Sequence, residues 1–569
     1  MADQYRRVSR RNFLKTLGLS AGAVELAAAC ASPAPPTTSG APTTPPQPVS
    51  TAAPPSLPTP VAAASPAATA VAPEQTAPAA VSSSGTLVVG HQGTPATLDW
   101  MRHTDTNAHE IDRQIFDTLL MRDQTSLAIG PSLAESYRLV DDKTWEFKLR
   151  RGIKFHNGEP FDGAAVKFSI GRMLDPQTGA TGRGNVSLID HVDVLDASTV
   201  RFVTKQPFPL LPTRNTPGQT GTIPIMPPGY IKDKGDDYFG THPVGTGPYK
   251  FVEWIKDDRV VLEANPDYFF GPPPIKQIIF KPIPEVATRV SALLAGQADI
   301  ITAVPPDQIG KINSSNVAQV KETELGGFMI IFKLSNISDW PGRNDKRVRE
   351  ALNRAIDMET LVKTVLQGHG KVLGWPLERE AFGYDANIHW YGYDPQKAKD
   401  LLQEASVADG FDFTLNCPDG RYLNDKAMAE AIAQQLHEVG VRANVQVWEQ
   451  SVYVTKWRQR ELLPSYMTAW GGAGLFDGDI LSNAFSTSSP LSIWDDSKLD
   501  DLLARAGQSV NADQRKDLYF QAQELVYDDC PCLPVWQQNS IFAVANKVDW
   551  KPELDSQIFL NKAKLKDRA

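Results

Sequence analysis

Apolar and polar positions alternate most regularly between residues 144 and 156 of the chain. In the first half of this stretch every second residue is apolar, namely Trp145, Phe147 and Leu149. Ile153 and Phe155 repeat the alternation up to Asn157-Gly158, a dipeptide typical of a tight turn. A period of two predicts strands with one buried and one exposed face. We therefore expect two consecutive hairpins in this region.

A helix is predicted directly after these hairpins. Its apolar residues fall at i, i+4, i+7 and i+8, which is one face of a helix: Val166, Ile170, Met173 and Leu174. Asp162 stands just before this run, and an aspartate at that point is a common N-cap. The local pattern from residue 144 to residue 174 is thus strand, strand and helix.

Helix and strand patterns continue to alternate along the chain. Residues 109–120 show helical periodicity, and further helices are predicted after Asn344 or Asp345 and after Asp394-Pro395. In the last case a capping residue precedes proline at the first helical position. Residues 441–447 then alternate as a strand. Several helix-to-strand units in series favour mixed or parallel sheets flanked by helices, so the predicted fold class is α/β.

The net charge excludes some partners. The chain of 569 residues has a formal charge of -9, and residues 1–29 carry five basic and two acidic residues, so the remainder carries -12. An acidic body has no basic stripe that could follow phosphates, and we expect no nucleic acid partner. No later segment has 18 consecutive apolar residues, so no membrane span is expected after the N-terminal region.

Residues 1–29 are predicted to be an export signal. The segment from Ser9, S-R-R-N-F-L-K, matches the twin-arginine pattern, and a mild apolar run follows it. The tetrapeptide ending at Cys30 resembles a bacterial lipoprotein cleavage site, which makes Cys30 the predicted lipidation site. An ordinary peptidase cut after an A-x-A sequence is the alternative. We expect a lipid-anchored protein on the outer face of the cytoplasmic membrane or in the periplasm.

Residues 30–84 are predicted to be a disordered tether. After Cys30 they consist almost wholly of Pro, Ala, Thr, Ser and Val, and Glu74 is the only charged residue. Such a composition cannot bury a core.

Several segments of the folded part resemble the family 5 solute-binding proteins, the extracytoplasmic receptors of peptide, nickel and related ABC importers. The resemblance rests on P-S-L-A-E-S from Pro131, W-E-F-K-L-R-R-G-I-K-F-H-N-G from Trp145, N-P-D-Y from Asn265 and V-R-E-A-L-N-R-A-I-D from Val348. It implies a two-lobed periplasmic-binding-protein-like fold, of the large type II class with an extra subdomain and a hinge between the lobes.

The resemblance also implies a domain organisation. Lobe I is expected to comprise residues 85–130, 244–325 and 520–569, with the extra subdomain at 131–243. Lobe II is expected at 326–519. The two crossings that form the hinge are then placed near 322–328 and near 511–531.

No catalytic motif is present. The chain lacks G-x-S-x-G and P-loop patterns, and His109-Glu110 lacks the second histidine of H-E-x-x-H. The nine histidines do not cluster at metal-ligand spacing, so we expect no metal centre and no cofactor. The protein is therefore predicted not to be an enzyme.

The cysteines allow one predicted disulfide. If Cys30 is lipidated, an odd number remains: Cys417, Cys530 and Cys532. Cys530 and Cys532 could bind a metal or form a strained local disulfide. We favour a pairing with Cys417 and assign it to Cys532.

The candidate ligand-binding segment is 469–479. Relatives carry a G-W loop against the ligand here, and glycines let backbone amides approach a solute while an indole offers a stacking surface. The predicted contacts are Trp470, Gly471, Gly472, Asp477 and Asp479. A glycine-rich turn beneath a core tryptophan is the alternative interpretation.

This segment departs from the family pattern at one position. Peptide-binding relatives tend to carry an aspartate three residues after the tryptophan, where this chain has Ala473. Asp477 or Asp479 would have to replace that aspartate. Trp375 and Arg379 are placed at the cleft by the resemblance, with packing or surface roles as alternatives.

The predicted function is capture of a peptide or peptide-sized polar solute between two lobes and its delivery to ABC permease subunits. The chain is expected to be a monomer. Because it has twelve tryptophans, an oligosaccharide is the second candidate solute, and nickel or haem the third. An exported hydrolase, or a receptor that signals without transport, is the alternative from another class.

Overall fold

The structure is a computed structural model that describes residues 84–124, 126–218, 222–373, 376–471, 476–489 and 492–566. The predicted signal, the tether and Cys30 lie outside these residues. The part of the chain that is described has no helix both long and apolar enough to cross a bilayer.

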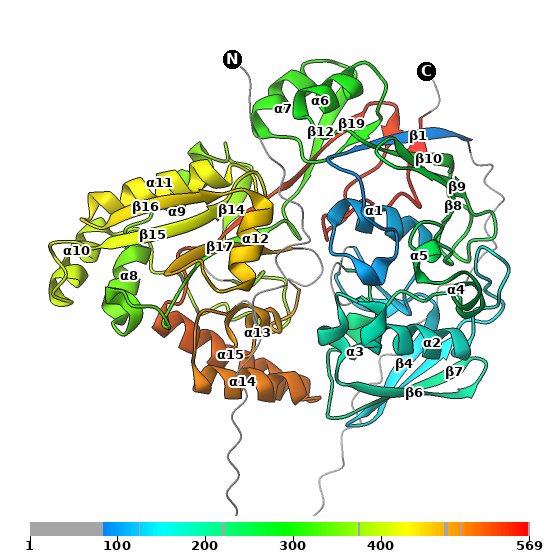
Figure 1. The fold of residues 1–569 in the computed structure, drawn as a ribbon, viewed down its shortest axis with the longest axis horizontal. Coiled ribbons are helices and arrows are strands. Elements are labelled where there is room, and N and C mark those ends of the chain that lie inside the picture. Colours follow the sequence, from blue (N-terminus) through cyan, green and yellow to red (C-terminus); the bar gives the residue numbers. More distant parts are fainter. Residues whose placement is uncertain are drawn as a thin grey trace, which may run out of the picture. The chain divides into compact units, whose positions relative to one another are not determined.

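A seven-stranded mixed sheet organises the first lobe, which we define as residues 84–323 and 540–566 (Figure 1). Its strands, in order across the sheet, are β12 (Ala318–Thr323), β19 (Ser540–Ala545), β11 (Ile300–Ile301), β1 (Ser84–His91), β10 (Ile275–Pro282), β9 (Arg259–Ala264) and β8 (Tyr249–Ile255). Strand β1 lies at the centre of the sheet. Leu87 and Val89 on β1 are fully buried.

Further elements complete this lobe. They are helices α1 (Thr106–Ile115), α6 (Val286–Leu294) and α7 (Pro306–Asn313), the turn η1 (Trp100–Arg102), and the strand pairs β2 (Leu120–Arg122) with β3 (Ile129–Pro131) and β20 (Val548–Asp549) with β21 (Lys564–Leu565). Helix α1 is shifted from the predicted 109–120. It begins after the N-cap Asp105, whose side chain accepts from Asn107 N, and it ends at Ile115.

A four-stranded antiparallel sheet forms the extra subdomain within residues 131–243. Its elements are β4 (Ala134–Asp141), β5 (Thr144–Leu149), β7 (Thr199–Thr204) and β6 (Ile189–Asp196), with helices α2 (Gly163–Leu174), α3 (Leu211–Arg214), α4 (Pro228–Lys234) and α5 (Asp236–Phe239) and the turns η2 (Pro176–Thr178) and η3 (Arg183–Val186). Asp162 caps α2 as predicted, accepting from two backbone amides. Glu146, expected on the exposed face of β5, is instead covered by ion pairs with Arg138 and Arg201.

The second lobe, residues 329–538, contains a six-stranded mixed sheet. Its strands in order are β14 (Gly370–Val372), β18 (Trp536–Gln538), β13 (Met329–Leu334), β17 (Ser465–Trp470), β15 (Asp412–Pro418) and β16 (Arg442–Trp448). All six residues of β13 are buried, as expected for a central strand covered on both faces.

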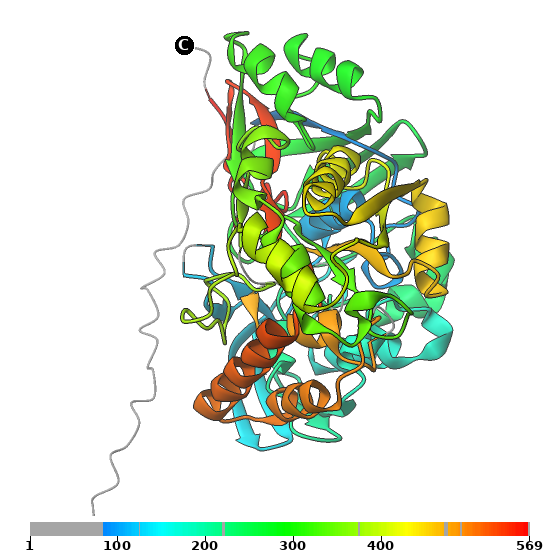
Figure 2. The ribbon, with the colours of Figure 1, turned by 90° about the vertical axis from the view of Figure 1, so that its left-hand side faces the viewer.

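Helices cover this sheet on both faces (Figure 2). They are α8 (Lys346–Arg354), α9 (Met358–Thr364), α10 (Pro395–Glu404), α11 (Asp425–Glu438), α12 (Gln450–Arg458), α13 (Ile480–Phe485), α14 (Ser497–Gln508) and α15 (Ala512–Asp529), with the turn η4 (Pro341–Arg343). The predicted caps Asp345 and Asp394 hold the first turns of α8 and α10 by accepting from backbone amides. Asp345 is thus the cap, and Asn344 is not.

The predicted boundary at residue 520 is wrong. Helix α15 belongs to the second lobe, because Leu518, Tyr519 and Val526 pack with Met329 and Ile331 of β13 in one apolar cluster. Strand β18 also pairs within the second-lobe sheet, and only β19 joins the first-lobe sheet. The chain therefore returns to the first lobe at Asn539, eight residues after the predicted 511–531 and inside the tolerance of about ten residues that this prediction carries.

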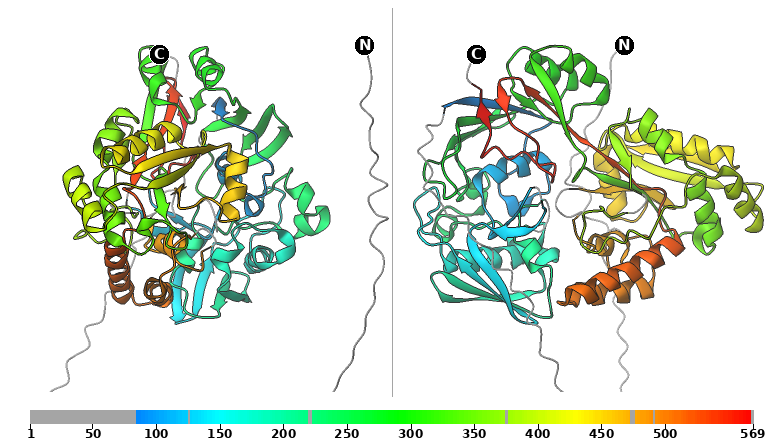
Figure 3. Two further views of the ribbon diagram at one scale, coloured as in Figure 1. Left: turned by 60° about the vertical axis from the view of Figure 1, so that its left-hand side comes forward. Right: turned by 180° about the vertical axis from the view of Figure 1, so that it is seen from behind.

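The two crossings run side by side. Residues 324–328 lead from β12 to β13, and Asn539 leads back from β18 to β19; the paired strands are visible in green and red in Figure 3. The antiparallel pairing Thr323 with Ser540 continues on the other side as Met329 with Gln537. Between these pairs Gln538 N donates to Phe328 O at 3.1 Å. This double connection is the hinge, and its first crossing falls within the predicted 322–328.

Gly327 leaves no room for a side chain at this hinge. A Cβ added there would lie 2.0 Å from the carbonyl oxygen of Gln538, so the two backbones would have to separate. We predict that Gly327→Ala lowers the free energy of unfolding by at least about 2 kcal/mol, measured by urea denaturation. Gly130→Ala is the control, because no atom lies within 4 Å of its added Cβ. Equal stability of the two variants would contradict the close approach.

Candidate functional site

An open recess of about 520 Å³ lies on the first lobe. The recess combines charged groups with aromatic rings, and its lining residues include Arg113, Phe116, Asp117, Arg122, Tyr268, Phe270, Glu553, Asp555 and Phe559. Helix α1 and the segments that follow it supply one wall, and the segment 553–559 supplies the other.

One cation of the recess is paired with two carboxylates, although its buried Nε has no hydrogen-bond partner among the described residues. Arg113, on α1, donates to Glu553 Oε2 at 2.5 Å and also to Asp555. Burial raises the pKa of Glu553 to about 7, although the Arg113 charge partly opposes this. Because the arginine already holds two carboxylates, it ties the C-terminal segment to α1.

The Asp117 carboxylate is also satisfied from within the lobe. It accepts from Thr246 Oγ1 at 2.8 Å and from the Tyr268 hydroxyl at 3.1 Å. Burial raises its pKa to about 6. Two of the three acidic groups in the recess therefore lose part of their negative charge near neutral pH.

Arg122, at the end of β2, is the cation that remains available. Arg122 donates to a main-chain acceptor, Leu127 O, at 2.7 Å, and it forms no ion pair with a carboxylate of the described residues. Its buried Nε has no hydrogen-bond partner among them. The guanidinium carbon lies 5.5 Å from the ring centroid of Phe476, a second-lobe residue. Arg122 thus lies where the recess meets the second lobe.

The predicted aspartates lie beside this point, and both are paired with arginines. Asp477 Oδ1 accepts from Arg515 at 2.5 Å, inside the second lobe. Asp479 Oδ2 accepts from Arg214 of α3 at 2.8 Å, which links the second lobe to the extra subdomain. Direct contact of either aspartate with a solute stays a prediction.

Trp470 ends β17 and is half-buried against Lys333. The Lys333 ammonium lies 5.7 Å from the Trp470 and Phe485 ring centroids and 5.9 Å from that of Tyr466. Lys333 is only 1% exposed, and burial lowers its pKa to about 7. Trp470 therefore forms part of an aromatic enclosure for a buried amine.

The remaining predicted contacts are scattered. Gly471 lies against the hinge, where an added Cβ would meet the Phe328 ring at 3.0 Å. Arg379 is exposed. Gly472 and Trp375 lie outside the described residues.

The predicted disulfide between Cys417 and Cys532 is wrong. Both thiols are free and buried, as is that of Cys530. Cys532 forms an antiparallel β-bridge with Lys333 of β13, on the edge of that strand where β18 lies. Cys417 lies on β15, which is on the other side of β13 and beyond β17. Three strand spacings, about 14 Å, separate these positions, and a disulfide needs Cα atoms within about 7 Å.

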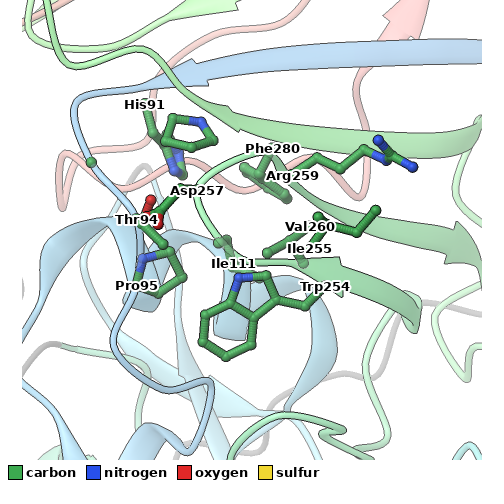
Figure 4. A pocket seen from close by; sticks show the side chains of 12 residues that line it. His91, Thr94, Pro95, Ile111, Trp254, Ile255, Asp257, Arg259, Val260 and Phe280 are labelled. Atoms are coloured by element: carbon green, nitrogen blue, oxygen red, sulfur yellow. The ribbon is translucent and has the colours of Figure 1, made fainter.

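A smaller recess of about 220 Å³ lies elsewhere on the first lobe, beside the β8–β9 hairpin (Figure 4). Trp254, Pro95 and Ile111 form much of its apolar wall, and His91 lies at its edge. All of its lining residues belong to the first lobe. It is smaller than the recess at Arg122.

The sequence analysis missed the charged residues of the large recess. Arg113 and Asp117 stand four residues apart around the end of a predicted helix, which is a detectable spacing. No local signal connects them with Glu553 and Asp555, more than 430 positions later in the chain. Arg122 likewise has no motif around it.

Residues 128–491 match the family model described as bacterial extracellular solute-binding proteins, family 5. The chain therefore belongs to this family, whose members serve ABC importers as extracytoplasmic solute-binding components. The predicted two-lobed fold and the function of a solute-binding component of an ABC importer are confirmed.

Individual proteins agree with this assignment. Heme-binding protein A of Haemophilus influenzae is 29% identical over 457 residues, 76% of this chain and 83% of that protein. Glutathione-binding protein GsiB of Pectobacterium atrosepticum is 27% identical over 484 residues, 83% of this chain and 92% of that protein. The periplasmic binding protein DppA of Helicobacter pylori, solved with the peptide STSA, has a TM-score of 0.72 and 25% identity, covering 85% of this chain and 98% of that one. These relatives are binding proteins of transporters rather than enzymes.

The buried Lys333 predicts a pH-dependent stability. Between pH 7 and pH 9 the folded lysine loses its proton while the unfolded lysine, with a pKa near 10.4, keeps it, so stability rises with pH. We expect the free energy of unfolding of the natural chain to rise by about 1–2 kcal/mol relative to Lys333→Met over this interval. Urea denaturation at both pH values measures the difference.

The matched control for this prediction is Lys399→Met, on the exposed face of α10. It should follow the pH profile of the natural chain. Parallel profiles for the natural chain and Lys333→Met would show that Lys333 keeps an ordinary pKa.

Proposed function

We propose that this protein binds a peptide or another peptide-sized solute that carries a carboxylate, and that Arg122 holds that carboxylate. The observation that supports this most directly is a half-buried guanidinium that contacts a second-lobe ring and forms no ion pair with a carboxylate of the described residues, although the charges of Asp477 and Asp555 act on it. A desolvated arginine with an unused donor is well suited to a charge-assisted, bidentate contact with an anion.

The other charges of the recess are consistent with an anionic group. Arg113 already neutralises Glu553 and Asp555, and burial raises the pKa of Asp117 to about 6. The recess is thus less negative than its composition indicates. A carboxylate beside Arg122 would therefore meet little repulsion.

The aromatic part of the recess would receive the apolar portion of the solute. Phe116, Tyr268, Phe270 and Phe559 contribute rings to the lining. An oligosaccharide could stack on these rings but would leave the Arg122 charge without a partner, and for this reason a peptide-like acid is preferred. Two relatives also support this choice, since DppA was solved with a peptide and GsiB is named for glutathione.

Binding of the solute between two hinged lobes would link recognition of the solute to its transport. A solute held by Arg122 and by the 476–479 segment would stabilise the arrangement in which both lobes contact it. The closed form would then be presented to the permease subunits of the importer. We further propose a monomer, exported by the twin-arginine route and anchored through lipidated Cys30.

Removing the Arg122 charge tests the solute assignment. We expect Arg122→Gln to weaken binding of a carboxylate-bearing solute about 10- to 100-fold, because a hydrogen bond to a charged group is lost. Mass spectrometry of co-purified compounds identifies the solute, and calorimetry with that compound measures the affinity.

Arg505→Gln is the matched control, since Arg505 is 56% exposed on α14 and far along the chain from the recess. It should bind as the natural chain does. A neutral co-purified compound, with unchanged affinity in Arg122→Gln, would refute the carboxylate assignment.

The anchor is tested separately. Cys30→Ser should move the exported protein from the membrane fraction to the soluble extracytoplasmic fraction, since the acylated residue is lost. Cell fractionation and immunoblotting measure the distribution, with Cys417→Ser as the control. Membrane retention of Cys30→Ser would exclude lipidation at this residue.

A further inference from the structure

We propose a buried transition-metal site in the first lobe, formed by His103, His109 and Asp112 and suited to Zn²⁺. One ligand atom of each residue lies within 4.8 Å of the other two. The sequence analysis expected no histidine cluster, and the fold brings this one together. The site is independent of the proposed solute and its recess.

Helix α1 supplies two of the three side chains. His109 and Asp112 stand at i and i+3, so they share one face of the helix. His103 comes from the segment between η1 and α1, where Thr181 Oγ1 donates to its carbonyl oxygen at 3.0 Å. The N-cap Asp105 fixes the start of the helix between them. All three side chains are therefore positioned by local structure.

The cluster contains several buried polar atoms that lack hydrogen-bond partners. His109 is 2% exposed, and neither of its ring nitrogens has a partner among the described residues. The same holds for His103 Nδ1 and Asp112 Oδ1. A neutral imidazole needs both an acceptor and a donor partner. Leaving so many groups unsatisfied in one place is costly in a folded protein unless another species binds there.

The donor set identifies the class of that species. Two imidazoles and one carboxylate are typical zinc ligands, and Zn²⁺ accepts them without a strict geometric preference. Asp112 can complete the coordination with its second oxygen, or a water can do so. A hydrogen bond of 2.6 Å joins His103 Nε2 and Asp112 Oδ2, and a metal bound between these groups would replace it.

The required movement is small. Tetrahedral zinc with bonds of about 2.0–2.1 Å places its ligand atoms about 3.3 Å apart. The most distant ligand atoms must therefore approach by up to about 1.5 Å, while His103 Nε2 and Asp112 Oδ2 must separate by about 0.7 Å. The His103 and His109 ring centroids are already 4.5 Å apart. Rotation of the side chains on a fixed helix can supply this contraction.

His91 and Glu110 form a separate pair nearby. His91 Nε2 lies 2.8 Å from Glu110 Oε2, and both side chains are buried. Glu110 precedes Ile111 on α1 and points away from the proposed ligands by its position in the helix. The charge of Asp99 is held by Arg172, so it is not available to the metal.

The test uses the full chain incubated with Zn²⁺, desalted and analysed by elemental mass spectrometry. We expect about one tightly retained Zn²⁺ per chain in the natural protein. His109→Gln and Asp112→Asn should each lower retention at least tenfold. His191→Gln is the matched control, because His191 is 48% exposed beside Asp190 and should not affect retention.

A second measurement separates metal loss from misfolding. Circular dichroism and solute binding should be unchanged in His109→Gln, and Zn²⁺ should raise the Tm of the natural chain but not of this variant. X-ray absorption of the zinc form should show two imidazole nitrogens and carboxylate oxygen. The proposal would be overturned if the natural chain retained no more Zn²⁺ than His109→Gln, or if both variants retained as much as the natural chain. A crystal structure that shows only a bridging water between the three side chains would also overturn it.

Discussion

The paired crossings between β12–β13 and β18–β19 are the constraint on which the rest of the structure depends. Each lobe has its own sheet and apolar core, and the main chain connects them by two adjacent segments that share backbone hydrogen bonds. Gly327 lets these backbones touch, and Gly326 gives the same close approach to the backbone of residues 554 and 555. Because the crossings are short and paired, the lobes can rotate relative to each other only about this region, while their interiors remain intact.

The recess depends on that arrangement in two ways. Its first-lobe wall is assembled by Arg113, which joins α1 to the C-terminal segment after the chain has crossed back. A second-lobe ring, Phe476, lies against Arg122, which is one of the residues that line the recess. The double crossing therefore positions both the first-lobe wall and this neighbouring ring.

Local patterns predicted local structure well. Asp162, Asp345 and Asp394 were identified as caps because their hydrogen bonds involve neighbouring residues only. Elsewhere the outcome depended on tertiary contacts that local patterns do not encode. Helix α15 would have the same apolar face in either lobe, so its sequence could not show at which residue the chain crosses back to the first lobe. The site depends on pairs such as Arg113 and Asp555, whose partners are brought together by the whole fold.

The ion pair between Arg214 and Asp479 joins the lobes through side chains as well as backbone. Burial raises the pKa of Asp479, so this contact carries a desolvation cost that the Arg214 charge only partly offsets. A contact of that kind adds little net affinity, yet it must be broken whenever the lobes separate. The ion pair can therefore determine how long the solute-bound receptor stays closed. It does not change which solute the receptor selects, so residence time and selectivity can vary independently.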